Sequence, residues 1–159
     1  SSNINKCLRY FPEDTKVVVV TRDPRDVFFV EKFVWNDNVV PHDPELFCEW
    51  FDYTHSSNRD ESPDKEKVIE INFEDLIYKY NEIVPTIEEF LGLSSLDHIN
   101  RFKFFNPKRS YENTQLWKKY KDEKSLAIIE NKLRKYLYDF DSVSCNDIAG
   151  VEVNNTSVF

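Results

Sequence analysis

The hydrophobic pattern changes its period near residue 16, and the change predicts a strand followed by a helix. Residues 17–20 are four consecutive valines, which are β-branched and apolar on both faces of a strand. This run predicts a short strand buried inside a parallel sheet. Residues 24–35 then carry apolar side chains at helical spacing. Pro24 suits the first turn of that helix, and Asp23 precedes it as a candidate N-cap.

The same pattern predicts further elements along the chain. Helical spacing is found in residues 3–11, 44–54, 74–91 and 122–140, the last predicting a helix of about four to five turns. Residues 68–73 predict a second strand. Asp43 is a candidate N-cap before Pro44, and Gly92 is expected just beyond the end of the helix that closes on Leu91.

Strands that are each followed by a helix predict an α/β chain with short parallel strands flanked by helices. A length of 159 residues fits one domain with a moderate core. We expect residues 1–140 to form the α/β domain. Residues 141–159 are rich in serine, asparagine and aspartate with isolated valines, and they predict a loose tail or an edge strand.

Composition narrows the classes of molecule that the protein is expected to bind and the cellular compartment in which it is expected. The net charge of −8 argues against a nucleic-acid binder, which usually shows a basic face. Cys7, Cys48 and Cys145 have neither metal-ligand nor CxxC spacing, so we expect free thiols in a reducing compartment. We expect no transmembrane segment, because no apolar run approaches the roughly 20 residues that would be needed. No secretory signal is recognised, and the expected location is the cytoplasm.

Arg22 is the residue with the clearest candidate chemistry. It follows the valine strand and precedes a helix N-terminus, which places it at the carboxyl edge of the predicted sheet. Ligands of open α/β sheets bind at that edge, and a guanidinium there suits a phosphate or a sulfate. The alternative is a structural salt bridge from Arg22 to Asp23 or Asp26.

The block Val-Val-Val-Val-Thr-Arg-Asp-Pro-Arg-Asp-Val resembles the 3′-phosphate-binding segment of sulfotransferases that use 3′-phosphoadenosine-5′-phosphosulfate. The resemblance implies a partial P-loop-type, sulfotransferase-like fold in which Arg22 contacts the 3′-phosphate of this donor or of adenosine 3′,5′-bisphosphate. It implies no metal and a hydroxyl-bearing acceptor. The family's second 3′-phosphate ligand is a serine eight positions after the arginine, and here that position is Val30.

Two later segments extend the resemblance. Phe73-Glu74-Asp75-Leu76 is similar to the family's Tyr-Glu-Asp-Leu segment, and Phe90-Leu91-Gly92-Leu93 matches its Phe-Leu-Gly-Leu. The resemblance implies that Phe73 flanks the adenine, although ordinary core packing at a strand end explains Phe73 equally well. It also implies that Lys108, Arg109 and Ser110 form the basic loop over the 3′-phosphate. The alternative for these three is a solvated basic loop.

The parts of the family's chemistry that this sequence lacks leave the catalytic residues unknown. A glycine-rich phosphate loop needs converging backbone N–H groups, and the only glycines are Gly92 and Gly150. The family's catalytic histidine lies before the valine strand, whereas His42, His55 and His98 lie after it. A missing N-terminal half or a partner chain would have to supply both parts.

Three functions therefore remain open. The first is a sulfotransferase that moves a sulfuryl group from the donor to a hydroxyl acceptor. The second is a non-catalytic remnant that serves as a nucleotide- or protein-binding module, which Val30 favours. The third is a phosphotransferase of related nucleotide-kinase architecture. Glu74-Asp75 as an acid–base pair has a simpler explanation as a helix-start pair interacting with the helix dipole.

Overall fold

The computed structural model describes residues 4–37, 39–56, 64–144 and 148–149. Its strands and α-helices are α1 (Ile4–Leu8), β1 (Val17–Thr21), α2 (Pro24–Val30), α3 (Pro44–Ser56), β2 (Val68–Asn72), α4 (Phe73–Tyr78), α5 (Tyr80–Leu91), α6 (Pro107–Ser110) and α7 (Glu123–Lys132). A π-helical turn, Glu31–Trp35, continues α2. Short 3-10 turns fill much of the rest: Ser95–Asp97, Tyr111–Asn113, Leu116–Lys118, Arg134–Tyr136 and Phe140–Ser142.

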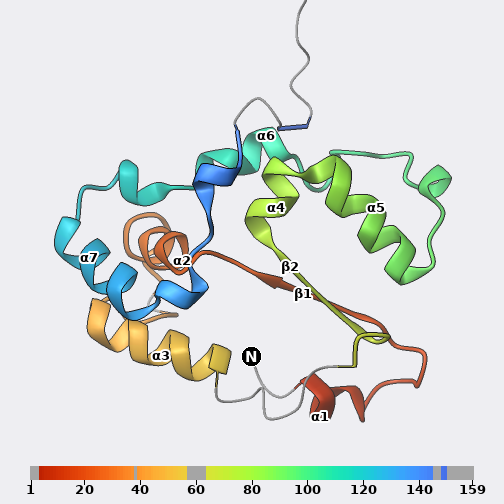
Figure 1. Cartoon of the computed structure of the whole chain (residues 1–159), viewed down its shortest axis with the longest axis horizontal. Coiled ribbons are helices and arrows are strands. Elements are labelled where there is room, and N and C mark those ends of the chain that lie inside the picture. Colours follow the sequence, from red (N-terminus) through yellow and green to blue (C-terminus); the bar gives the residue numbers. More distant parts are fainter. Residues whose placement is uncertain (1–3, 38, 57–63, 145–147, 150–159) are drawn as a thin grey trace, which may run out of the picture.

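β1 and β2 form a parallel two-stranded sheet in a register that runs from Val17 opposite Val68 to Thr21 opposite Asn72. The crossover between them carries α2 and α3, so the predicted α/β chain with short parallel strands flanked by helices is confirmed. Figure 1 shows α2, α3 and α7 gathered on one side of the carboxyl ends of the strands, with α4, α5 and α6 on the other.

The valine strand is less buried than its sequence predicts. Val17 to Val19 are half-buried, and Val20 is 52 % exposed. The reason is that, within the described residues, β1 pairs with β2 alone and has no strand on its other side. A run of β-branched residues predicts a strand, but the number of strands that pair with it depends on the rest of the fold.

The predicted helix boundaries are confirmed where local chemistry sets them. The Asp23 side chain accepts a hydrogen bond from the N–H of Arg25 at the start of α2. Asp43 accepts from the N–H groups of Glu45 and Leu46 at the start of α3. Gly92 ends α5 in the left-handed region at φ 71°, as expected of a residue just past a helix.

Two predicted helices were too long. The helix expected over residues 74–91 is split at Lys79 into α4 and α5. The helix expected over 122–140 ends at Lys132 and gives way to a 3-10 turn. Beyond that turn the backbone N–H of Tyr138 donates to the Asp23 carboxylate instead of to a carbonyl four residues back. The helical hydrogen bonding is therefore already lost before Tyr138, whose backbone is bonded to a buried carboxylate of another element.

The buried side chains form two clusters. The larger one joins α2, α3 and α7 around Phe28, Phe29 and Phe47, all fully buried. It includes Val30 and Cys48, and burial raises the pKa of the Cys48 thiol to about 11. The smaller cluster gathers around Ile77 and Tyr78 of α4.

Two further predictions concern the ends of the chain and the membrane. Among the residues that the structure describes, no helix is both long enough and apolar enough to cross a bilayer. The predicted tail begins with the 3-10 turn Phe140–Ser142, and most of it, including residues 150–159, lies outside the described residues.

Candidate functional site

The parallel register of the strands brings two polar side chains together at the carboxyl edge of the sheet. Thr21 lies opposite Asn72, and its hydroxyl donates hydrogen bonds to the Ile71 carbonyl at 3.2 Å and to Asn72 Oδ1 at 3.0 Å. Asn72 is followed directly by α4, and only Arg22 separates Thr21 from Asp23, the N-cap of α2. The edge is therefore polar, and the chain turns sharply on both strands there.

Arg22 lies at this edge and is held by two contacts. One terminal nitrogen of its guanidinium donates to the backbone carbonyl of Asn113, and the guanidinium carbon lies 5.0 Å from the centre of the Phe73 ring. The Nε of Arg22 is buried without a hydrogen-bond partner among the described residues. Burial lowers the pKa of Arg22, although nearby carboxylates, Asp26 foremost, oppose that effect. The group stays a cation whose buried Nε–H has no partner in the described structure.

The alternative prediction, a salt bridge from Arg22 to Asp23 or Asp26, is wrong. No ion pair of Arg22 is found in the described part of the chain. Arg25 pairs with Asp23 instead, with Nε–Oδ1 and Nη2–Oδ2 distances of 3.0 and 2.8 Å. Asp26 accepts from the backbone N–H groups of Gln115 at 2.9 Å and Leu116 at 2.8 Å. The two carboxylates nearest in sequence are thus engaged by other groups.

Glu74 completes a buried group of three carboxylates around Arg22. Asp23, Asp26 and Glu74 are at most 2 % exposed. The Glu74 side chain accepts from the backbone N–H of Asp23 at 3.0 Å through Oε1, while Oε2 is buried without a partner in the described structure. Desolvation by burial is the main reason that the pKa of Glu74 rises to about 7 and that of Asp26 to about 6.

A cleft of about 380 Å³ opens beside this edge, a size within the range of about 300–1,000 Å³ that is usual for ligand pockets. Its lining comes from the ends of both strands, from the end of α3 and from the segment after α7. The residues that line it are Thr21, Arg22, Asp23, Phe51, His55, Glu70, Asn72, Lys135, Tyr136, Leu137, Tyr138 and Asp139. Arg22 and Lys135 give it two cations.

The other predicted site residues do not line this cleft. Phe73 is half-buried at the first position of α4, where it packs edge-on against Phe105 with the ring centres 6.2 Å apart. Because the Phe73 ring lies next to the Arg22 guanidinium, both predictions for Phe73 stay open, namely that it flanks the adenine and that it is ordinary core packing. Lys108 and Arg109 are exposed on α6 and Ser110 is half-buried, and the turn that follows α6 supplies the Asn113 carbonyl. The role of these three residues in a basic loop over the 3′-phosphate stays a prediction.

Val30, which occupies the position of the family's serine, is 3 % exposed and packs in the larger core cluster. The position therefore faces the core and supplies no hydrogen-bond donor. No group of three or more His, Cys, Asp or Glu side chains suited to a metal ion is found in the described residues. The carboxylates around Arg22 are held by N–H donors and by Arg25.

Sequence reasoning missed Glu74 as a buried neighbour of Arg22. It follows β2 in the chain, and a carboxylate at the start of a helix is usually explained by the helix dipole. The sequence signal was the position itself, since Glu74 lies two residues after the second strand and Arg22 lies one residue after the first. Lys135 carried no signal, because it reaches the cleft only through the early end of α7.

Comparison with known proteins adds no relative to this description. Neither a family model, nor a curated protein, nor a solved structure matches the chain.

Proposed function

We propose that this chain binds the 3′-phosphate of an adenosine 3′,5′-bisphosphate nucleotide at Arg22 and belongs to a sulfotransferase-like protein. The observation that supports the proposal most is the state of Arg22, a cation at the carboxyl edge of a parallel sheet, lining a cleft, with a buried Nε–H that has no partner in the described structure. Unpaired buried donors are costly, so a ligand oxygen that accepted this hydrogen would be favoured.

The residues present fit the 3′-phosphate end of the nucleotide better than the phosphosulfate end. Arg22 offers a planar donor for a phosphate oxygen, and Phe73 presents a ring beside it. Lys108, Arg109 and Ser110 are proposed to approach from α6, because Arg22 already contacts the turn that follows this helix.

The nucleotide 3′-phosphoadenosine-5′-phosphosulfate would supply the sulfuryl group for transfer to a hydroxyl acceptor. That reaction also needs donors around the phosphosulfate and a base for the acceptor hydroxyl. A chain with two glycines contains no glycine-rich loop for the first task. We therefore assign to this chain the recognition of the 3′-phosphate and do not assign the base for the acceptor hydroxyl to any of its residues.

A non-catalytic nucleotide-binding module is the second candidate. The core position of Val30 favours it, because one of the family's two phosphate ligands is replaced by an apolar side chain that packs away from the cleft. Both candidates share the same binding site and differ only in whether transfer follows.

Calorimetric titration with adenosine 3′,5′-bisphosphate tests the shared site, with adenosine 5′-monophosphate as the nucleotide that lacks the 3′-phosphate. We expect the bisphosphate to bind more tightly, and Arg22→Ala to weaken its binding by about 1.5–3 kcal/mol, the usual worth of a hydrogen bond to a charged group. That loss corresponds to about 10- to 150-fold in Kd.

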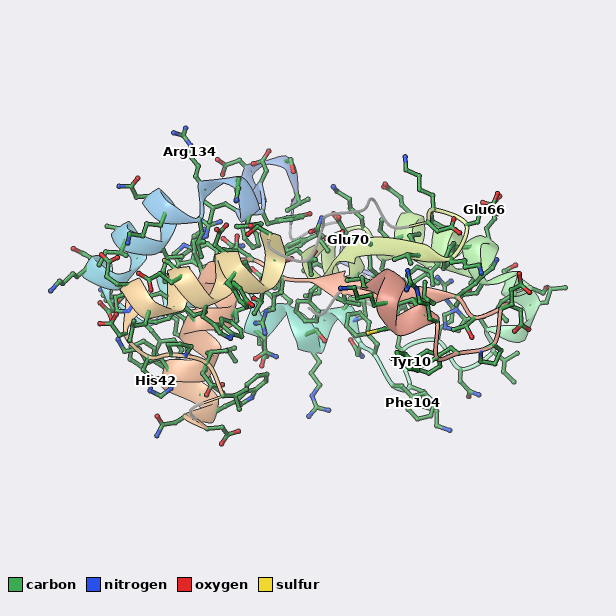
Figure 2. All side chains as sticks on the ribbon, turned by 90° about the horizontal axis from the view of Figure 1, so that it is seen from below. Tyr10, His42, Glu66, Glu70, Phe104 and Arg134 are labelled. Carbon is green, nitrogen blue, oxygen red and sulfur yellow. The ribbon has the colours of Figure 1, made fainter. Side chains whose placement is uncertain are left out.

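Arg134→Ala is the matched control, since Figure 2 shows the Arg134 side chain pointing out from the body of the molecule. It removes the same charge from an exposed position and should leave Kd unchanged. Equal affinity for the two nucleotides, or an Arg22→Ala protein that binds as well as the wild type, would remove Arg22 from the site. Transfer of label from a radioactive phosphosulfate donor to a hydroxyl acceptor then separates the enzyme from the binding module.

A further inference from the structure

The buried carboxylates around Arg22 outnumber the cations that can neutralise them. Asp23, Asp26 and Glu74 carry three negative charges when ionised, and Arg22 and Arg25 carry two positive ones. Arg25 is committed to Asp23 through two hydrogen bonds. Arg22 is left to balance two carboxylates without a direct ion pair to either in the described structure.

Glu74 is the member of this group that is least satisfied as an anion. Its side chain is fully buried, and only Oε1 has a hydrogen-bond partner. Asp26, by comparison, receives two backbone N–H donors. A buried carboxylate with an unpaired oxygen gains most from binding a proton, because the neutral acid needs less solvation.

The surroundings of Glu74 would not hold it ionised once an anion arrived. The titratable and charged groups that act on it come from the turn after β1, from α2 and from the segment after α7: Arg22, Asp23, Asp26 and Tyr138. Arg22 is the one cation among these groups, and a bound phosphate would take up its charge. Lys108 and Arg109 of the packed helix α6 are exposed.

We infer that Glu74 takes up a proton when a phosphate monoester binds at Arg22, so that the site binds its ligand together with one proton. This inference rests on the proposed function of Arg22. The proton comes from solvent and ends on the Glu74 carboxyl, and no other bond forms or breaks. The pKa of about 7 for Glu74 means that the group is mostly ionised above neutral pH and is able to accept the proton there.

The test is calorimetric titration of the full chain with adenosine 3′,5′-bisphosphate at pH 7.5, in phosphate-free buffers of different ionisation enthalpy. The dependence of the observed enthalpy on the buffer gives the number of protons taken up. We expect uptake of about 0.5–0.8 proton per nucleotide, with affinity falling about three- to sixfold per unit between pH 7 and pH 8. The phosphate itself, with a second pKa of about 6, is already a dianion over this range.

Glu74→Gln should bring the proton uptake close to zero and flatten the pH dependence. The matched control is Glu66→Gln, the same change at an exposed residue that does not line the cleft and is labelled in Figure 2. It should keep the wild-type uptake. If Glu74→Gln does not fold, the wild-type measurement still decides, because binding without proton uptake overturns the inference.

The outcomes separate the two proposals. Nucleotide binding that depends on Arg22 but takes up no proton leaves the proposed function standing and removes the role of Glu74. Proton uptake that persists in Glu74→Gln also leaves the proposed function standing and removes the role of Glu74, because another group must then take up the proton. Absence of binding at millimolar nucleotide overturns both.

Discussion

At the scale of single residues, Asp23 and Asp43 show how burial changes the contribution of an Asp-Pro helix start to stability. Each aspartate precedes a proline and caps the first turn of a helix, α2 and α3 respectively. Asp43 is exposed and does nothing more in the described contacts. Asp23 is buried, pairs with Arg25 and accepts from the Tyr138 backbone. The same Asp-Pro pair is therefore expected to contribute differently to the free energy of unfolding at the two positions.

We expect Asp23→Ala to lower the free energy of unfolding by about 3–5 kcal/mol, because it leaves the mostly buried Arg25 charge with only the exposed carboxylate of Glu130 as a partner. Asp43→Ala should cost about 1 kcal/mol, the usual value of an exposed N-cap. Urea unfolding of both variants measures the difference. Equal losses would show that the pairing with Arg25 adds nothing to the cap.

At the scale of elements, the end of α5 depends on one glycine. Gly92 adopts φ 71°, and a Cβ built there would have no atom within 4 Å. Substitution thus meets no steric clash with neighbours, and its cost is that of the left-handed conformation alone.

Gly92→Ala should lower the free energy of unfolding by about 1–2 kcal/mol, the cost of placing an L-residue in the left-handed region. Gly92→Asn should cost less, because asparagine visits this region more readily. Urea midpoints at constant slope give both values. A neutral Gly92→Ala would mean that the helix end relaxes to another conformation.

The elements also show where sequence prediction succeeded. The starts of α2 and α3 and the end of α5 are set by Asp-Pro pairs and a glycine, which act on their own turns. The segment after α7 was missed because its contacts are distant: the Asp23 carboxylate that accepts from Tyr138 lies 115 residues away in sequence. A helical pattern continues through residue 140 although the backbone does not.

At the scale of the whole molecule, the buried carboxylates predict how stability depends on pH. The folded state raises the pKa of Glu74 from 4.5 to about 7 and that of Asp26 from 3.8 to about 6. Between the unfolded and folded values the native protein binds more protons than the unfolded chain. Stability must therefore fall as pH rises through this window.

We expect the free energy of unfolding to be higher at pH 5.5 than at pH 8, by about 2 kcal/mol from Glu74 and by about 3 kcal/mol with Asp26 included. Urea unfolding at the two values measures it. Glu74→Gln should remove most of the difference, whereas Glu66→Gln should keep it. On the acid side the opposite holds for Asp122, whose pKa its partner Lys32 lowers to about 2, so that its contribution is lost as pH falls toward that value. Stability that is flat from pH 5.5 to 8 would contradict the burial of an ionised Glu74.

Only the part of the candidate site that comes directly after β1 could be predicted from the sequence. The position of Arg22 follows from the valine run and Pro24, which fix a strand-to-helix turn. The partner of Arg22 did not follow: the expected carboxylates are taken by Arg25 and by backbone N–H groups, and a distant carbonyl at Asn113 receives the guanidinium instead. No local rule could assign that pairing.

The sequence by itself determined the elements whose causes are local: β-branched strands, proline and aspartate at helix starts, and a glycine at a helix end. Only the tertiary structure decided how far β1 is buried, where α7 stops and that Glu74 lies fully buried near Arg22. The physical reason is that burial and charge pairing depend on distance in space. Glu74 and Arg22 are 52 residues apart in the chain and become neighbours only because two parallel strands end at the same edge.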